Sequence, residues 1–162
     1  MQFEHIISFL LLLTIANGAP VLAKKLGGTF LAFPLDRGKI LADGRPVFGA
    51  SKTVRGVVVS VFAAAIAAPM FGWAWTTGCL AGGAAMIGDL LSSFIKRRMG
   101  KVPSSKALGI DQIPESLLPS LACKNLVGLT SSDVITIVAI FSVGQWLFSP
   151  WLYRWNIRDE PH

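Results

Sequence analysis

One acidic side chain of this sequence lies in the middle of a long apolar stretch. Asp89 stands in the run 86–91, whose other members are apolar residues or glycine. A carboxylate inside a membrane helix costs roughly 2.5–17 kcal/mol, depending on the scale, and is kept where it pairs with something or binds something. Four polar residues follow at offsets of +3, +4, +7 and +8: Ser92, Ser93, Lys96 and Arg97. These offsets share one helical face, so the spacing predicts a stripe of carboxylate, hydroxyls and cations.

A second acid, Asp111, lies at the boundary of the next apolar segment and is followed by Gln112. Two carboxylates beside several cations suit a divalent metal that holds a polyphosphate, because carboxylates bind Mg²⁺ while Lys and Arg neutralise phosphate oxygens. We therefore expect Asp89 and Asp111 to bind Mg²⁺, with Lys96 beside them. Two simpler interpretations stay open: Asp89 pairs with a Lys or Arg, and Asp111 caps the helix that follows.

The basic, glycine-rich stretch 48–56 has the composition of a phosphate-binding loop. It is not a Walker A loop, since two residues separate Gly49 from Lys52 and no strand precedes it. Lys52 can still bring a point charge to a phosphate, with the backbone N–H groups of Gly49 and Thr53 beside it. A loop that only marks membrane topology would explain any single residue here equally well.

The composition indicates what kind of structure must position these residues. The chain has 162 residues, of which 52% are hydrophobic and 15% charged, and its mean hydropathy is +0.58. Soluble domains carry about 25% charged residues, so a soluble globule is a poor fit, as are a disordered chain and a disulfide scaffold. The length suits one domain. We expect a single integral membrane domain over residues 1–162.

Five apolar segments lie along the chain, at residues 3–23, 54–72, 73–95, 113–129 and 134–153. Since a span takes about 20 residues, they predict an all-α, polytopic membrane protein with about five transmembrane helices and two polar loops. We expect the first helix to break at 17–20, because Pro20 frees a backbone carbonyl at the level of the Asn17 amide. The fourth segment contains Pro114 and Pro119, so it is either a short helix or a re-entrant segment.

The basic residues are concentrated in the two polar loops. There are 15 Lys and Arg against 9 Asp and Glu, a net charge of +6. Seven of the 15 lie between Lys24 and Arg55 and five between Lys96 and Lys106. By the positive-inside rule both loops are cytoplasmic and the N-terminus is outside, which predicts a multi-pass protein of the cell (inner) membrane. Docking to anionic headgroups and binding of a phosphorylated substrate are compatible with the same pattern.

Several motifs together resemble the CDP-archaeol synthase family, which is related to the CDP-diacylglycerol synthases. They are Asn17-Gly18-Ala19-Pro20, Asp36-x-Gly38, Asp43-Gly44-Arg45-Pro46, Phe48-Gly49-x-Ser51-Lys52-Thr53-x-Arg55-Gly56, Gly88-Asp89-Leu90-x-x-Ser93-Phe94-Ile95-Lys96-Arg97-Arg98 and Ile110-Asp111-Gln112-Ile113-Pro114. They occur in the family's order over nearly the whole chain. Two positions depart from it: Val54 stands where an aromatic residue is common, and 108–112 replaces the His-Gly-Gly…Asp-Arg stretch of the diacylglycerol branch.

The resemblance implies a Mg²⁺-dependent cytidylyltransferase that transfers CMP from CTP to an archaeol-type or phosphatidate-like lipid phosphate and releases pyrophosphate. Asp89 and Asp111 match the family's metal-binding positions. The catalytic set expected is Asp89, Asp111 and Lys96, and the set expected around the CTP phosphates is Lys52, Thr53, Arg97, Arg98, Asp43 and Asn17. The partners implied are CTP, a membrane lipid phosphate and membrane lipids, with no nucleic acid. The oligomeric state is left open.

Two other classes of function remain as alternatives. A small membrane transporter also places an acid in a glycine-rich helix near a broken helix, and a non-catalytic membrane subunit needs no such acid. The sequence shows no inverted repeat, and its polar residues gather in two loops on one side. This distribution favours an enzyme whose site faces the cytoplasm.

Overall fold

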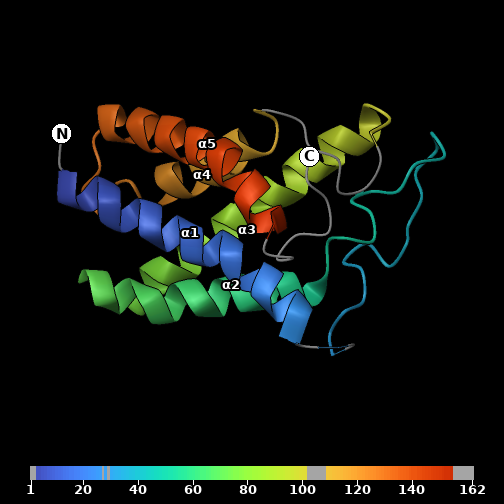
Figure 1. Ribbon diagram of the computed structural model, residues 1–162, viewed down its shortest axis with the longest axis horizontal. Coiled ribbons are helices and arrows are strands. Elements are labelled where there is room, and N and C mark those ends of the chain that lie inside the picture. The colour runs from blue at the N-terminus through green and yellow to red at the C-terminus, as the bar shows by residue number, and fades with distance from the viewer. Residues whose placement is uncertain (1–2, 27, 29, 102–108, 155–162) are drawn as a thin grey trace.

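The computed structural model describes residues 3–26, 28, 30–101 and 109–154, with side chains to residue 147. Its elements are α1 (Phe3–Leu26), α2 (Val54–Ala67), the 3-10 helix η1 (Ala68–Phe71), α3 (Trp75–Arg98), α4 (Gln112–Cys123) and α5 (Ser131–Arg154). These elements are all helical (Figure 1). The expected all-α class is confirmed.

Three helical stretches are long and apolar enough to cross a membrane: Phe3–Leu26, Val54–Phe71 and Trp75–Arg98. The described part of α5 adds a shorter apolar helix, Ser131–Leu147. Large apolar side chains point outward along α2 and η1, where Phe62, Ile66 and Met70 are all more than half exposed. Such a surface suits lipid rather than water, so the protein is a multi-pass membrane protein.

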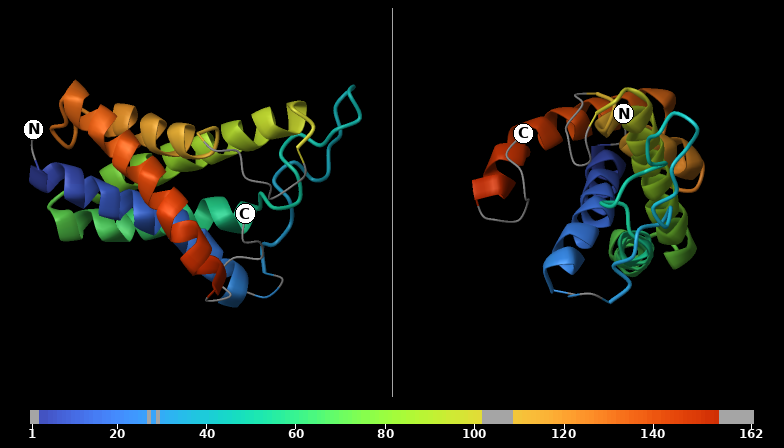
Figure 2. Two further views of the ribbon diagram at one scale, coloured as in Figure 1. Left: turned by 45° about the horizontal axis from the view of Figure 1, so that its top comes forward. Right: turned by 90° about the vertical axis from the view of Figure 1, so that its right-hand side faces the viewer.

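Helix α4 is the short member of the bundle. Its 12 residues span about 18 Å, against roughly 30 Å for the hydrocarbon core of a bilayer. The segment 113–129 is therefore a short helix followed by turns. The connection from α4 to α5 lies at the same end of the molecule as the N-terminus, and α5 returns towards the polar loops (Figure 2).

The expected break in the first helix is wrong. Helix α1 continues through Pro20 to Leu26. The side-chain amide of Asn17 donates to the carbonyl of Leu13 at 3.0 Å, one turn back along the same helix. A break would expose several backbone groups to hydrocarbon, whereas proline removes only one N–H group, so the continuous helix is the less costly solution.

Glycines on α3 set how closely it packs against α2. A Cβ atom at Gly78 would lie 2.2 Å from the carbonyl oxygen of Ala64, and one at Gly82 would lie 2.9 Å from that of Ser60. Only a residue without a side chain allows this approach. The two helices form an antiparallel hairpin, and α3 also contacts α1 and α4. It is thus the central helix.

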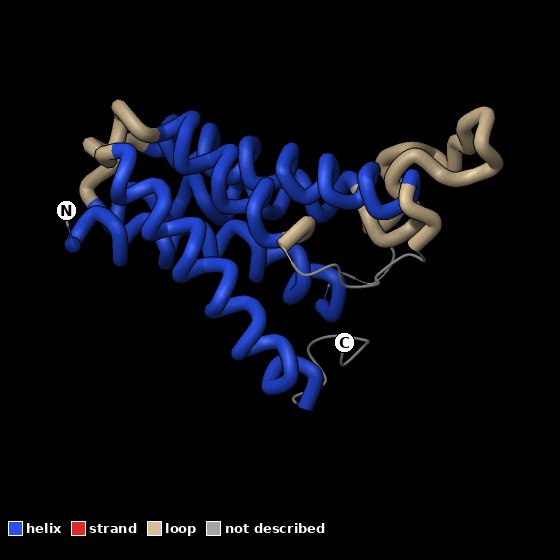
Figure 3. The backbone as a smooth tube through the Cα atoms, turned by 90° about the horizontal axis from the view of Figure 1, so that it is seen from above, coloured by secondary structure: helices blue, strands red, loops and turns tan. Residues whose placement is uncertain are grey.

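The loop 30–53 and the end of α3 lie together at one end of the bundle. The tube view shows the loop 30–53 beyond the end of α3, next to the segment that follows that helix (Figure 3). The opposite end carries the N-terminus and the turns 124–130. The polar chemistry of the chain is therefore gathered at one end, where α3 finishes and α2 begins.

Candidate active site

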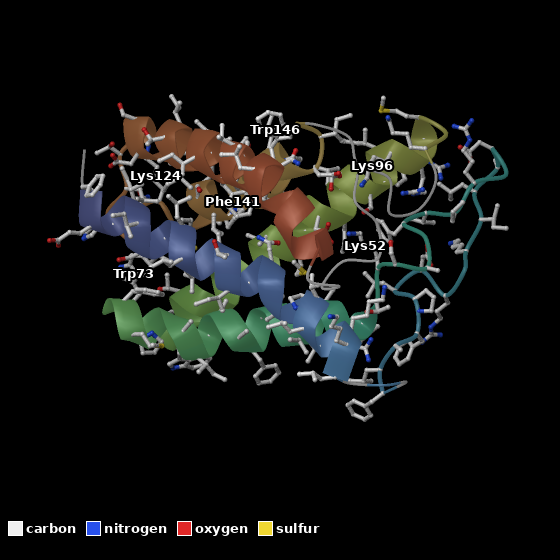
Figure 4. All side chains as sticks on the ribbon, in the orientation of Figure 1. Lys52, Trp73, Lys96, Lys124, Phe141 and Trp146 are labelled. Atoms are coloured by element: carbon white, nitrogen blue, oxygen red, sulfur yellow. The ribbon has the colours of Figure 1, made fainter. Side chains whose placement is uncertain are left out.

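Two lysine–aspartate ion pairs lie at the loop end of the bundle. Lys52, just before α2, places its Nζ atom 2.6 Å and 2.7 Å from the two carboxylate oxygens of Asp89 on α3. Lys96, near the end of α3, lies 2.7 Å from Oδ1 of Asp111, which precedes α4. Both lysines are labelled in Figure 4 and lie towards the end of α3. The simpler interpretation of Asp89, that it pairs with a lysine, is what the structure shows, and Asp111 makes an ion pair rather than a side-chain cap.

The polar stripe predicted on α3 is present and faces the protein. Ser92 and Ser93 are fully buried, and the two cations of the stripe are nearly so, with Lys96 7% and Arg97 3% exposed. The Ser92 hydroxyl donates to the backbone carbonyl of Asp89 at 2.9 Å. Buried cations are rare unless they are paired, so this face of α3 is built to hold negative charge.

A third acid, absent from the expected site, lies beside Asp89. Glu115 on α4 is only 8% exposed, and it lies near enough to Asp89 for the two carboxyl groups to act on each other electrostatically. Gln145 on α5 donates its amide to Oε2 of Glu115 at 3.2 Å. The sequence carried a signal for this residue, since Glu115 is an acid in an apolar segment just as Asp89 is.

Helices α3 and α4 touch next to these two acids. A Cβ atom at Gly88 would lie 2.3 Å from the carbonyl oxygen of Pro114 and 2.8 Å from the backbone nitrogen of Glu115. The backbones of the two helices are therefore in contact at Gly88, one residue before Asp89, and at the peptide group between Pro114 and Glu115. This contact explains how two carboxyl groups from different helices come to meet.

The polar loop is tied to the end of α3 by two arginines. Nη1 of Arg98 lies 2.5 Å from Oδ2 of Asp43, an ion pair that is partly open to solvent. Arg98 also donates to the carbonyls of Arg45 and Pro46. In the other direction, Arg45 donates to the carbonyls of Arg97 and Arg98 at the end of α3. Asp43 and Arg98 thus lie together at the outer edge of the site.

The loop itself is folded around Asp36. Its carboxylate accepts from the backbone N–H groups of Phe48 and Gly49, both at 2.9 Å, and from that of Gly38 at 3.0 Å. Burial opposes ionisation of Asp36, but the N–H groups of Gly49, Phe48 and Gly38 outweigh it and hold the pKa of this carboxyl below its usual value. The expectation that the Gly49 N–H group faces a phosphate is wrong, because Asp36 accepts it.

Two further predicted residues have structural partners of their own. Thr53 is the N-cap of α2, and its hydroxyl oxygen accepts from the backbone N–H group of Gly56 at 3.2 Å. Asn17 is half-buried on α1 and donates to its own helix. Gly56 lies against Pro20, since its Cβ position would be 3.8 Å from the Pro20 Cβ atom. This level of α1 is therefore packed on the first turn of α2.

The donor set matches the requirements of a divalent cation carried with a polyphosphate. Among the described residues no group of three or more His, Cys, Asp or Glu side chains could hold a metal ion by itself. Mg²⁺ is commonly held by one or two carboxylates, with waters and substrate phosphates completing the shell. Asp89 has a second carboxyl group beside it, and the cations Lys52, Lys96 and Arg97 lie on the same side. The residues present fit such an ion only together with its phosphate ligand.

Comparison with known proteins supplies the context for this site. The family model described as CarS-like, CDP-archaeol synthase, matches residues 70–162. The CDP-archaeol synthase of Pyrobaculum calidifontis is 36% identical over 152 residues, covering 91% of this chain and 90% of the relative. That of Pyrococcus abyssi is 31% identical over 157 residues, covering 90% of each chain.

A solved structure shares the arrangement of the helices. It is described as that of an intramembrane enzyme for archaeal membrane lipids biosynthesis. The TM-score is 0.74 at 28% sequence identity, over 87% of this chain and 90% of the other. The similarity therefore extends over most of the length of both chains.

Proposed function

The chain belongs to the CDP-archaeol synthase family of membrane enzymes, and from that membership we propose that it transfers CMP from CTP to a lipid phosphate and releases pyrophosphate. The observation that carries this proposal is the buried face of α3, where Asp89 and Lys96 each pair with a residue from another segment. Such a face suits a reaction whose reactants all carry phosphate. We infer that the lipid is an archaeol-type or phosphatidate-like phosphate.

The reaction is a substitution at phosphorus. An oxygen of the lipid phosphate forms a bond to the α-phosphorus of CTP, the bond from that phosphorus to the bridging oxygen of the β-phosphate breaks, and pyrophosphate leaves with the electron pair. The phosphate monoester is itself an adequate nucleophile, so no covalent intermediate with the protein is required. Catalysis then consists of positioning the two reactants and of neutralising their negative charge.

The two ion pairs prepare the site for this charge. Lys52 and Asp89 are already paired and partly desolvated, as are Lys96 and Asp111. Asp89 and Asp111 would hold a divalent cation that accompanies the nucleotide, and Lys52 and Lys96 would then contact phosphate oxygens in place of these carboxylates. Each charged group would keep an oppositely charged partner before and after binding. The free energy of desolvating these groups is therefore a cost of folding and not of nucleotide binding. Bound Mg²⁺ would act as a Lewis acid on the phosphate oxygens.

The remaining residues of the proposed site divide by position. Arg97 is buried on the same face as Lys96 and would contact the leaving pyrophosphate. Arg98 and Asp43 lie at the outer edge and would close the loop over the nucleotide. Thr53 would act through its backbone, because its hydroxyl oxygen caps α2. Asn17 would border the site from α1.

The charge pattern supports one orientation in the membrane. The loop 30–53 and the end of α3, which carry many of the basic residues, lie at one end of the bundle, and we infer from the positive-inside rule that this end is cytoplasmic. CTP would then enter from the cytoplasm, while the lipid enters laterally between helices and keeps its chains in the bilayer. We propose the cell membrane as the location on these grounds.

One assay tests the function directly. Purified protein in detergent or lipid is incubated with Mg²⁺, a panel of nucleoside triphosphates, and diether and diacyl phosphates, and pyrophosphate release is followed together with the CDP-linked lipid. We expect turnover with CTP and at least one of the lipid phosphates. Absence of turnover with every combination would overturn the proposal and favour a transporter or a non-catalytic subunit.

A further inference from the structure

A groove lies between the last turn of α1 and the first turns of α2, at the loop end of the bundle. Its volume is about 310 Å³, and it is lined by Ala23 and Leu26 of α1, by Val58 and Val59 of α2, by the segment 30–31 and by Arg55. Every lining side chain except that of Arg55 is apolar. A concave surface of this size and composition suits part of an apolar ligand, with one polar group to orient it.

The groove continues into the surface of α2 that faces lipid. Val58 lines the groove and is exposed, and Phe62 and Ile66 follow it at intervals of four residues. Residues at this spacing share one face of a helix, and Phe62 and Ile66 are both more than half exposed. The groove is therefore reached from the bilayer along an apolar path, which a hydrocarbon chain can follow.

Arg55 brings a buried positive charge to this groove. It is only 7% exposed, and its Nη1 atom donates to the backbone carbonyls of Gly28 at 2.8 Å and Phe30 at 3.4 Å. No carboxylate among the residues that the structure describes forms an ion pair with it. Buried cations are rare without an opposite charge, and carbonyl oxygens carry only a partial one. The groove therefore offers a full positive charge to an anionic ligand.

The charge and the apolar lining are arranged along the groove as they are in a lipid. Helix α2 begins at the loop end, so Arg55 lies nearer to that end than Val59, which comes four residues later, about 6 Å further along the helix. Helix α1 runs in the opposite direction, so Ala23 lies deeper than Leu26. The cation thus lies at the level of the polar loops, and the apolar residues extend from it into the membrane.

The groove is distinct from the proposed reaction site. Lys52 contacts Asp89 on α3, whereas Arg55 contacts the segment that follows α1. Backbone hydrogen bonds fix this wall of the groove, since the N–H group of Arg55 donates to the carbonyl of Leu31 at 3.0 Å. The two cations therefore serve different neighbours, and occupation of the groove leaves the Lys52–Asp89 pair intact.

We propose that the groove binds one anionic phospholipid of the surrounding membrane, with a hydrocarbon chain between α1 and α2 and the headgroup phosphate on Arg55. A guanidinium group matches the geometry of phosphate oxygens. The lipid is not the reacting phosphate, so the inference does not depend on the proposed function. If Arg55 only held the two carbonyls, the groove would accept a chain from any lipid without regard to its charge.

The test compares two lipids with identical chains, anionic phosphatidylglycerol and zwitterionic phosphatidylcholine. Neither carries the phosphate monoester that the proposed reaction uses. The purified full chain is titrated with each lipid in detergent, and native mass spectrometry gives the dissociation constant of the first bound lipid. Arg55→Gln removes the charge, Arg55→Lys keeps it, and Ala23→Leu fills part of the groove. The matched controls are Lys39→Gln, an exposed cation of the loop, and Ile66→Ala, an exposed apolar position; both lie outside the groove lining.

We expect the wild type to bind phosphatidylglycerol about tenfold more tightly than phosphatidylcholine, the effect of one hydrogen-bonded charged contact. Arg55→Gln should bind both lipids with the affinity of the wild type for phosphatidylcholine, while Arg55→Lys should retain part of the preference. Ala23→Leu should weaken binding of both lipids by a similar factor, because it acts on the chain and not on the headgroup. Lys39→Gln and Ile66→Ala should match the wild type.

The proposal fails on any of three results. Equal affinity of the wild type for the two lipids would exclude recognition of an anionic headgroup. Equal affinities of Arg55→Gln and Lys39→Gln for phosphatidylglycerol would exclude Arg55 as the phosphate contact, as would the same loss of preference in Arg55→Lys and Arg55→Gln. Wild-type binding of both lipids by Ala23→Leu would exclude the groove as the place of the chain, and this variant decides if Arg55→Gln does not fold.

Discussion

Lys52 and Asp89 are joined by two short contacts, 2.6 Å and 2.7 Å from one ammonium nitrogen to the two oxygens of one carboxylate. The pair connects the loop before α2 to the middle of the central helix α3. Each side chain is about one fifth exposed, so the pair is shielded but can still be reached from the loop end. Each of the two side chains can therefore exchange its partner for another group of the same charge, without leaving an unpaired charge inside the membrane.

Replacement of Asp89 by Asn should abolish CMP transfer. The amide keeps the shape of the side chain but carries no charge for a cation, and loss of a preorganised electrostatic group costs roughly 10²–10³-fold in rate. Turnover of Asp89→Asn is measured with Mg²⁺, CTP and lipid phosphate after insertion has been verified. Glu4→Gln is the control, since Glu4 is an exposed acid at the opposite end of α1. Full activity in Asp89→Asn would exclude Asp89 as the metal-binding residue.

Replacement of Lys96 by Met should weaken binding of CTP. The change removes the cation paired with Asp111 and leaves that acid in a mostly buried position, so both nucleotide affinity and stability should fall. We expect the KM for CTP to rise by about tenfold or more, which corresponds to the roughly 1.4 kcal/mol or more of a lost charged contact. Lys25→Met, an exposed position at the end of α1, should leave KM unchanged. An unaltered KM in Lys96→Met would contradict the proposed contact.

Replacement of Gly88 by Ala should disturb the site more than other glycine changes on α3. The new Cβ atom would meet the Pro114 carbonyl at 2.3 Å, and overpacking of this kind costs about 1–3 kcal/mol. Thermal melting and turnover are both measured. Gly83→Ala meets nothing within 4 Å and should be neutral or slightly stabilising.

Gly78→Ala provides the second control for that prediction, because its Cβ atom would meet the Ala64 carbonyl at 2.2 Å but far from Asp89 along α3. At equal loss of melting temperature, Gly88→Ala should lose more activity than Gly78→Ala. Parallel losses in the two variants would show that the α3–α4 contact acts through stability alone.

The loop should lose stability in acid because of Asp36. Its pKa lies below the usual value of 3.8 in the folded state, so the carboxylate stabilises the fold above pH 3.8, and this contribution is lost as the pH falls through the lowered pKa. Asp36→Asn should therefore melt below the wild type at pH 6, and the difference should shrink as the pH approaches 3. A difference that is constant over this range would show that Asp36 acts by shape rather than by charge.

Part of the site follows from the sequence because one helix contains it. The offsets from Asp89 to Ser92 and Lys96 determine their common face as soon as α3 is helical, and the structure buries that face. The ion-pair partners are different, since Lys52 and Asp111 approach from other segments, and no local rule fixes which lysine meets which acid. The motif spacing predicted the residues but not the pairs.

The two corrections also have physical reasons. Pro20 removes one backbone N–H group from α1. In a membrane, however, the intact helix keeps more backbone groups hydrogen-bonded than a broken helix would. Glu115 was given no role, because its closeness to Asp89 depends on the close approach of α3 and α4 at Gly88. Close approaches between helices depend on the tertiary fold, which a one-dimensional pattern does not contain.

The placement of Asp89 along α3 has a consequence for the lipid environment. Asp89 lies nine residues before Arg98, a distance of about 14 Å along the helix, whereas the headgroups of lipid substrates lie at a depth set by the bilayer. With Asp89 as the proposed cation ligand, the protein fixes the plane of the reaction, and the membrane thickness fixes the plane of the substrate headgroups. Hydrophobic mismatch, which shifts one plane against the other at a cost of fractions of a kcal/mol per Å, becomes a determinant of turnover alongside the residues of the site.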